Sequence, residues 1–530
     1  MPSSTNAAKP IIPMNTFPSS PRTALPFMPM QRFAICAVAI LLSACANMSG
    51  IQTSAHSNTA ADYATATSLP NQGGQWPDAS WVTRIGGAPL QELTDEALAA
   101  NPDLQVAASR VAAARAMVEA AGASSKPQVG ASFSTTRQRF TENSIYPPPF
   151  GGEYVTDNEL ALNFSYDLDF WDKHGAELRS ALSQSKAAEA EHYASRLMLT
   201  TAVAKAWIQL ARQYAQLDLS NQQLTLRDQL DRLTEQRFRA GLDTQSDNQQ
   251  SRLQVATLRN DQAQWIEAIA LTRNQLAALL GQGPDRGLRI PQPTLPAEIA
   301  IALPDQLPMG LLGRRADIVA ARWQVEAAQS DIKVAKTEFY PNVNLSAMIG
   351  LSSLGWTNFL SKSSMVNGIG PAIHLPIFEG GALRAQLKGR VAAYDGAVAT
   401  YNKALTDALH EVSDQVQSLR AAEIVKTNQE AATQAAERAM KLAQQRQQVG
   451  TANMLQVVAT QITYLSQRKL ELDTRARRAD LRIGLIRSLG GGFDAGTEGL
   501  TPATNSAPDT KKSSDNNPLS NRPPLANAAS

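Results

Sequence analysis

Four segments of the chain alternate between apolar residues and small or polar residues, and this period of two predicts β-strands. The clearest segment runs from 160 to 170, where every even position is Leu, Phe or Tyr and every odd position is small or polar. Shorter segments of the same kind lie at 129–135, 343–351 and 369–377. Each predicted strand therefore has one apolar face and one face of smaller or polar side chains.

Two long spans without proline predict very long helices. No proline lies between Pro149 and Pro284, or between Pro376 and Pro502, and good helix formers dominate both spans. Apolar residues within them recur at steps of four and three, the heptad period of helices that pack side by side. These residues are Val203, Trp207, Leu210, Tyr214, Leu217 and Leu224, and later Leu405, Leu409, Val412, Val416 and Leu419. A helix over 173–238 would be on the order of 100 Å long.

Shorter helices are predicted at 94–124 and 314–338, the first entered at Thr94 beside acidic residues that favour a helix start. Gly241 and Gly450 come after the two very long helices. Glycine favours the left-handed turn that ends a helix and lets the chain fold back as a second one.

The chain contains an internal duplication. The motifs Asp-Leu at 103–104 and Pro-Gln-Val at 127–129 recur 214 residues later (103 to 317) as Asp-Ile and Pro-Asn-Val. The Arg-(x)3-Gly motif at 237–241 recurs 209 residues later (237 to 446) at 446–450. The length of 530 residues suggests three or four domains at about 150 residues each. The duplication instead predicts one strand–helix unit that occurs twice.

Composition excludes several kinds of chemistry. The 49 Lys and Arg residues nearly balance 47 Asp and Glu, which argues against nucleic-acid binding because that needs a clustered basic face. Two cysteines cannot form a four-thiolate zinc site, and the five histidines lack metal-ligand spacing. No nucleophile or phosphate-binding motif occurs. We therefore expect no enzyme activity, no metal and no cofactor.

The N-terminal region has the features of an export signal. An apolar run at 33–42 follows Arg32, and it is too short to span a bilayer but suits a signal-peptide core. Residues 1–27 lack signal character, so Met28 or Met30 is an alternative start. The sequence Leu-Ser-Ala-Cys at 42–45 resembles the lipobox of bacterial lipoproteins, which implies an N-acyl diacylglycerol lipid on Cys45 and, with alanine next, an outer-membrane destination. The alternative is an ordinary signal peptide with a chance cysteine.

The strands have the length and one-sided pattern of transmembrane β-strands. Four strands cannot close a barrel alone, because the smallest single-chain outer-membrane barrels have eight. Several chains must then share one barrel. The alternative is a small soluble sheet beside a coiled coil, with the lipid as the membrane contact.

The segment from Leu311 to Val343, with Leu-Leu-Gly-Arg-Arg-Ala-Asp-Ile at its start and Phe-Tyr-Pro-Asn-Val at its end, resembles the signature of the TolC/OprM-like outer-membrane efflux factors. The Pro-Ile-Phe-Glu-Gly-Gly motif at 376–381 and the two Arg-(x)3-Gly turns are also similar. The resemblance covers about 75–492, and the lipobox indicates the lipoprotein (NodT-type) branch. One departure is Ala316, where the family usually has proline.

The resemblance implies an α+β membrane protein that forms a homotrimer. Four strands per chain would make a 12-stranded outer-membrane β-barrel, and the long helices would continue it as a periplasmic α-helical barrel. The implied function is passive conduction of drugs or other small molecules from an inner-membrane pump and a periplasmic adaptor to the exterior. Resistance-nodulation-division, major-facilitator and aromatic-acid pumps are all compatible partners. The alternatives are a duct for protein secretion and a non-conducting, lipid-anchored coiled-coil spacer.

The expected organisation has six parts, which follow from the lipobox, the duplication and the composition of the ends. They are a signal peptide at 1–44, a lipidated and extended arm at 45–93, a first efflux repeat at 94–281, a linker at 282–308, a second repeat at 309–492 and a disordered tail at 493–530.

The resemblance also implies functional residues at the two turns between long helices. Adaptor contact at the periplasmic tips is expected from Arg237, Gly241, Arg446 and Gly450. A gate is expected from Asp243, Asp247, Leu455 and Gln456, with the aspartates giving cation preference and Leu455 a hydrophobic constriction. The alternative is that Asp243 and Asp247 are ordinary turn and helix-start residues.

Overall fold

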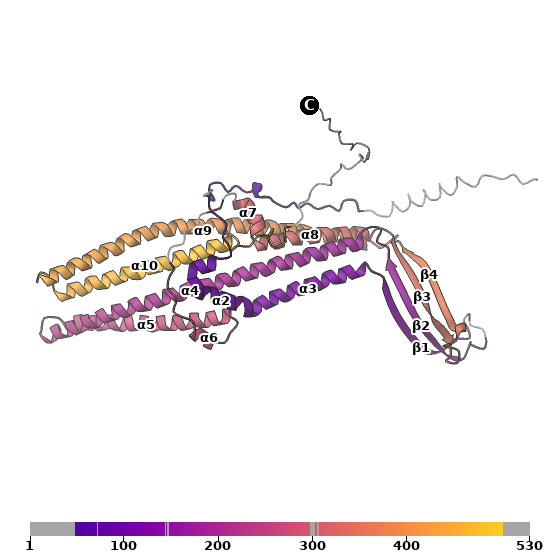
Figure 1. Ribbon diagram of the computed structural model, residues 1–530, viewed down its shortest axis with the longest axis horizontal. Helices are drawn as coiled ribbons and strands as arrows, with labels where there is room; N and C mark the ends of the chain where they lie inside the picture. The colour runs from indigo at the N-terminus through magenta and orange to yellow at the C-terminus, as the bar shows by residue number, and fades with distance from the viewer. Residues whose placement is uncertain are drawn as a thin grey trace, which may run out of the picture.

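The computed structural model describes residues 48–70, 73–143, 145, 148–296, 303–304 and 307–501. A long body of helices carries a small β-sheet at one end (Figure 1). Cys45, the expected signal peptide and most of the expected C-terminal tail lie outside the described residues. Within the described part, no helix combines the length and the hydropathy needed to cross a bilayer.

One antiparallel sheet contains the four predicted strands in sequence order. They are β1 (Gln128–Arg139), β2 (Tyr154–Asp167), β3 (Asn342–Leu354) and β4 (Met365–His374). Register places the apolar residues opposite one another, for example Val129 with Phe164, Phe164 with Ala347, and Ala347 with Ile369. Partners in register point to the same side, so the sheet has one apolar face and one face of smaller or polar residues.

Two predicted strand ends were wrong. β4 ends at His374 and not at 377, two residues before Pro376, which has no amide hydrogen to donate to a neighbouring strand. β2 ends at Asp167 and not at 170, because Asp169 accepts hydrogen bonds from the backbone amides of Lys173 and Gly175 (2.5 and 3.3 Å), which turns the chain toward the next helix.

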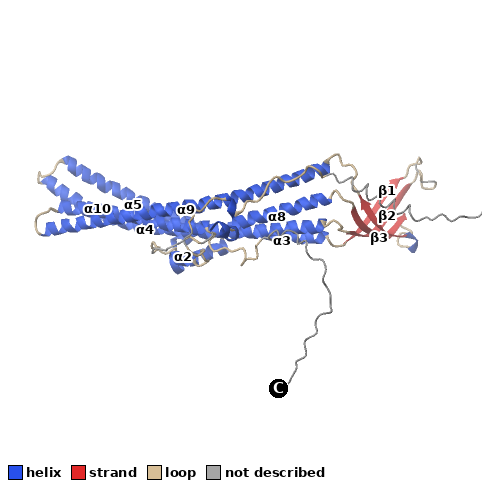
Figure 2. Ribbon diagram, turned by 90° about the horizontal axis from the view of Figure 1, so that it is seen from above, coloured by secondary structure: helices blue, strands red, loops and turns tan. Residues whose placement is uncertain are grey.

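The long helices occur in two matching pairs, as the duplication predicted. α4 (Lys173–Arg239) and α9 (Ala382–Gln448) have 67 residues each, and α5 (Gln245–Leu279) and α10 (Met454–Ser488) have 35 each. Each pair forms an antiparallel hairpin, and both hairpins end at the extremity of the molecule opposite the sheet (Figures 1 and 2). In the half of the body nearest the sheet, α3 (Pro102–Ser124) packs on α4, α4 packs on α8 (Ala316–Thr337), and α8 packs on α9.

The predicted helix start at Thr94 was wrong. Thr94 lies inside α2 (Trp81–Ala100), where its hydroxyl donates to the Leu90 carbonyl at 2.9 Å. A new helix begins after Asn101, whose side chain accepts from the amides of Asp103 and Leu104, because Pro102 suits the first helical position. The expected extended arm is therefore helical from Trp81 onward, apart from a kink at Gly87.

Apolar packing concentrates halfway along the body, where short elements surround the long helices. The predicted heptad residues Val203, Leu210, Leu405 and Val412 are fully buried there. Trp81 and Leu90 of α2 pack with Leu210 and Ile483 in one cluster. The remaining short helices are α6 (Asp285–Leu288), α7 (Leu307–Arg314), η1 (Ala60–Asp62) and η2 (Lys362–Ser364).

The N-terminal arm, residues 48–70, lies along α9. Thr53 donates a hydrogen bond to Asp395, the amide of Asn58 donates to Asn402 Oδ1 (2.8 Å), and Tyr63 pairs with Thr406 (3.0 Å). These contacts advance along α9 as the arm advances, so the arm starts at the end of the helices nearest the sheet and runs toward the middle of the body.

Candidate functional site at the helix tips and the strand–helix junction

Both long hairpins turn through the same backbone motif. After α4, Gly241 has φ 72°, its amide donates to the Phe238 carbonyl (2.9 Å), and the Leu242 amide donates to the Arg237 carbonyl (2.8 Å). After α9, Gly450 has φ 76°, and the Thr451 amide donates to the Arg446 carbonyl at 2.8 Å. These are Schellman caps, in which the left-handed residue favours glycine. The predicted turn glycines are confirmed as helix ends.

The second helix of each hairpin starts differently. In α5 the Thr244 side chain accepts from the Asp247 amide (3.2 Å), and Asp247 Oδ2 accepts from the Thr244 amide (3.0 Å), which forms a capping box. In α10 the Asn453 side chain accepts from the Gln456 amide at 2.9 Å. Gln456 therefore occupies the position of Asp247, but without a charge.

The two predicted tip arginines have different surroundings. Arg237 donates two hydrogen bonds of 2.9 Å to the two carboxylate oxygens of Asp243, and this pairing raises the pKa of the guanidinium. At the equivalent position of the second hairpin, Ala452 replaces Asp243. No ion pair to Arg446 occurs among the described residues, and its side chain is exposed. A bidentate ion pair thus closes the first turn only.

A second charge cluster stabilises the first hairpin. Glu235 on α4 accepts from Arg239 (2.9 Å) and from Arg252 (3.1 Å) on α5, and also from Asn248 (2.5 Å). These hydrogen bonds lower the pKa of Glu235. The window 235–252 holds three acidic and three basic residues, whereas the matching window 444–461 holds Arg446 alone. The two tips therefore share one backbone conformation but differ in the number of charged side chains.

The predicted gate residues lie at these tips. Asp243 and Asp247 both have local roles, in the ion pair with Arg237 and in the capping box, as the turn-and-helix-start alternative proposed. Asp247 is exposed, and Leu455 is half-buried in the first turn of α10 beside exposed Gln456.

Polar side chains join the two hairpins in the half of the body farther from the sheet. Arg212 donates to Asp473 (2.6 Å), Gln216 donates to the Lys469 carbonyl (3.0 Å), and Gln223 donates to Ser466 (3.1 Å). Among the described residues, the Gln223–Ser466 bond is the one nearest the tips between α4 and α10. Between this bond and the tips, no hydrogen bond joins α4 to α10 among the described residues.

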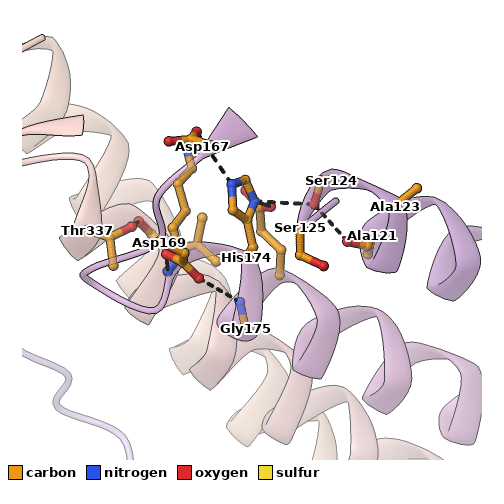
Figure 3. Close-up of polar contacts among 12 residues, drawn as sticks. Ala121, Ala123, Ser124, Ser125, Asp167, Asp169, His174, Gly175 and Thr337 are labelled. Carbon is orange, nitrogen blue, oxygen red and sulfur yellow. Dashed lines mark hydrogen bonds and ion pairs between the residues drawn. The ribbon is translucent and has the colours of Figure 1, made fainter. Parts of the chain in front are cut away.

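A polar cluster that sequence reasoning missed joins strands to helices at the other end of the body. His174 Nε2 lies 3.4 Å from Asp167 Oδ2 at the end of β2, and Nδ1 lies 3.1 Å from Glu177 and 3.2 Å from Ser124 at the end of α3 (Figure 3). The partners come from three elements, so only the folded topology brings them together.

A cavity of about 250 Å³ lies beside this cluster. Its lining comes from three connections between strands and helices: β2 to α4, α8 to β3, and β4 to α9. No group of three or more His, Cys, Asp or Glu side chains with metal-binding geometry occurs in the part of the chain that the structure describes.

Comparison with known proteins identifies the family to which this architecture belongs. Residues 93–282 and 307–491 match the profile of the family described as outer membrane efflux protein. The fusaric acid resistance protein FusA of Burkholderia cepacia is 35% identical over 359 residues, which are 67% of this chain and 68% of that protein. The multidrug resistance outer membrane protein MdtP of Escherichia coli K12 is 30% identical over 432 residues, 79% of this chain and 88% of that protein.

Solved structures of outer-membrane proteins have the same fold as this chain. The outer membrane protein VceC of Vibrio cholerae matches with a TM-score of 0.72 and 38% identity, over 79% of this chain and 100% of that one. The outer-membrane channel OprN matches with a TM-score of 0.72 and 25% identity, over 84% and 99%. The expected fold class is confirmed: four strands per chain contribute to a trimeric 12-stranded barrel, which a helical barrel continues. The chain belongs to the outer membrane efflux protein family and is the outer-membrane channel component of a tripartite efflux system.

Proposed function

We propose that three copies of the chain form a passive duct for small organic molecules, including drugs and aromatic acids. The cargo classes are suggested by the relatives, which are named for multidrug resistance and fusaric acid resistance. The sheet is the observation that carries the proposal. It has one apolar face, and in the single chain its edge strands β1 and β4 each have one unpaired side. Unpaired backbone groups cost several kcal/mol each in lipid, so pairing of β1 with β4 of the next copy satisfies both edges.

We propose that a periplasmic adaptor binds the two hairpin tips and that an inner-membrane pump loads the duct. The tips expose apolar residues, including Leu242 (66% exposed) and Val449 (73%), which suit contact with another protein. Arg446 offers its guanidinium for a carboxylate of the adaptor, while Arg237 maintains its own turn through Asp243. Gly241 and Gly450 set the shape of both tips.

We propose a gate at the same end of the trimer. Because Arg237 neutralises Asp243, Asp247 is the acidic residue of this turn whose charge no cation offsets among the described residues. It would supply the cation preference, with Leu455 as an apolar constriction and Gln456 as its neutral counterpart in the second hairpin.

We propose that Cys45 carries a lipid that anchors the arm in the outer membrane. Met48 packs with Phe339 and Leu387 where helices meet the sheet. Cys45 precedes Met48 by three residues in the sequence, so the proposed lipid is attached close in sequence to the residue that packs at this junction. We also propose that the two repeats span 94–281 and 309–492, with a linker at 282–308 between them, the arm before them and the tail after them. The first boundary falls within α2.

Drug accumulation in a strain that lacks this gene tests the transport proposal. Cells without the duct should accumulate several small organic molecules, fusaric acid among them, and expression of the wild-type chain should restore efflux. Unchanged accumulation across chemically distinct drugs, with an intact pump and adaptor, would contradict it. A non-conducting spacer predicts that unchanged result.

A further inference from the structure

We propose that the cavity at the strand–helix junction seats the chain's own lipidated N-terminus, namely the glyceryl ester and amide groups attached to Cys45. The inference rests on the proposed lipidation of Cys45. It goes further, because it gives the lipid a defined binding site on the protein in place of a loose tether in the bilayer.

The cavity has a rigid aromatic wall. Trp171 stacks on Tyr340 with ring centroids 4.6 Å apart, and its indole Nε1 donates to the Pro341 carbonyl at 2.9 Å. These residues join the connection from β2 to α4 with that from α8 to β3. Leu383, in the first turn of α9, forms part of the lining contributed by the third connection.

The N-terminal arm leads to this cavity. Met48, Ile51 and Leu383 pack against the same apolar cluster, which includes Phe339 and Leu387. The Ser49 carbonyl accepts a hydrogen bond from Arg384 at 3.1 Å, one residue after Leu383. The arm therefore starts beside the cavity lining. Cys45 precedes Met48 by three residues, a span of about 10 Å at most, and the proposal requires the attachment point to reach the cavity within that span.

The lining suits uncharged acceptors. Ester and amide carbonyls of the lipid accept hydrogen bonds, and the cavity offers Lys173 and His374 as donors. Lys173 forms an ion pair with Glu338 at 3.8 Å, a distance too long for a hydrogen bond, so its ammonium hydrogens can still be donated to the lipid. His374 has no side-chain hydrogen bond to another described residue. Two exposed apolar residues, Phe170 (67%) and Phe378 (88%), lie in the connections that form the cavity and could contact acyl chains that leave it for the bilayer.

The same lining disfavours a free phospholipid. Four carboxylates, from Asp167, Asp169, Glu338 and Glu379, face one lysine and two histidines. A phosphate group would meet net negative charge, whereas the glyceryl thioether of a lipoprotein has no phosphate. Attachment to the chain also raises the effective concentration of the lipid at the cavity to the millimolar range or above. We therefore assign the cavity to the chain's own lipid.

Photocrosslinking tests the assignment. Cells are fed a fatty acid with a diazirine near its carboxyl end, and the purified protein is irradiated and digested. Mass spectrometry of the N-terminal peptide first shows whether Cys45 is acylated. An unmodified Cys45 removes the proposed anchor and this inference together. With acylated Cys45, crosslinks should concentrate in peptides covering 168–173 and 376–383. Crosslinks spread over the apolar face of the strands would overturn the cavity assignment and leave the anchor intact.

A paired variant provides the control. Replacement of Lys173 and His374 by alanine should lower these crosslinks about tenfold, because two hydrogen bonds are lost. Lys362→Ala, on the exposed connection between β3 and β4, should leave them unchanged. The same variants are also expressed with a signal peptide that does not direct lipidation, so that the exported chain carries no lipid. Equal loss of trimer heat resistance with and without the lipid would mean that Lys173 and His374 support the fold alone, and would contradict the assignment.

Discussion

At the scale of single residues, similar motifs have unequal roles. The two Arg-(x)3-Gly turns share their backbone bonds, yet Arg237 is paired with Asp243 and Arg446 has Ala452 in that place. A motif therefore predicts the turn, because helix ends depend on local backbone bonds. It does not predict which side chain remains available for a partner.

We expect Asp247→Asn to reduce the cation preference of the channel. Asparagine can still accept at the capping position, so the helix start survives while the charge is lost. The double variant Arg237→Gln/Asp243→Asn is the matched comparison and should have a smaller effect, since it removes both members of a neutral ion pair. Single-channel recordings in asymmetric salt measure both. Unchanged selectivity in Asp247→Asn would leave this residue as a helix cap and remove it from the gate.

We expect the cation preference to be constant between pH 7 and 5. Hydrogen bonds from Thr244 lower the pKa of Asp247 below its ordinary value of 3.8, so the carboxylate is ionised throughout that range. A lowered pKa means that the capping stabilisation is present above the unfolded-state pKa and is lost as the pH falls through the folded-state pKa. Selectivity that changes between pH 7 and 5 would indicate another titrating group.

At the scale of elements, the sheet should tolerate charge on one face only. Ile369→Lys places a lysine on the apolar face in the middle of β4, at a cost of about 2–4 kcal/mol if that face meets lipid. Asn163→Lys places the same charge on the other face of β2 and should be tolerated. The yield of folded trimer in outer-membrane fractions compares them. Equal yields would contradict a lipid-facing apolar surface.

The hairpins should respond differently to loss of their tip arginines. Arg237→Ala removes the ion pair that closes the first turn, so amide hydrogen exchange should increase at 238–247. Arg446→Ala removes no ion pair among the described residues, so exchange at 447–456 should stay the same while binding of the adaptor weakens. Faster exchange in both variants, or no effect of Arg446→Ala on binding, would contradict the proposed division of roles.

Sequence patterns predicted the elements well where the determinants are local. Period two located the four strands, and the heptads with Gly241 and Gly450 located both hairpins. A single helix over 94–124 misses the break at Asn101, because it puts Pro102 in a helix interior, whereas Pro102 is the first residue of α3. The junction cluster was missed because Ser124, Asp167 and His174 are separated in sequence and meet only after the strands and helices are in place.

At the scale of the whole molecule, two copies of one strand–helix unit form an elongated body with its sheet and its tips at opposite ends (Figure 1). This polarity suits a duct that opens outward through the sheet and receives cargo at the tips. It also explains the length of 530 residues without separate globular domains. Three such bodies share a barrel that one body cannot close.

The assembled trimer should conduct ions across a membrane. Purified, heat-resistant trimers added to a planar lipid bilayer should produce discrete current steps of uniform size, with cation preference that Asp247→Asn reduces. Monomeric protein should produce none. Trimers that insert into the bilayer but give no steps at any voltage would contradict a conducting channel and favour a lipid-anchored spacer.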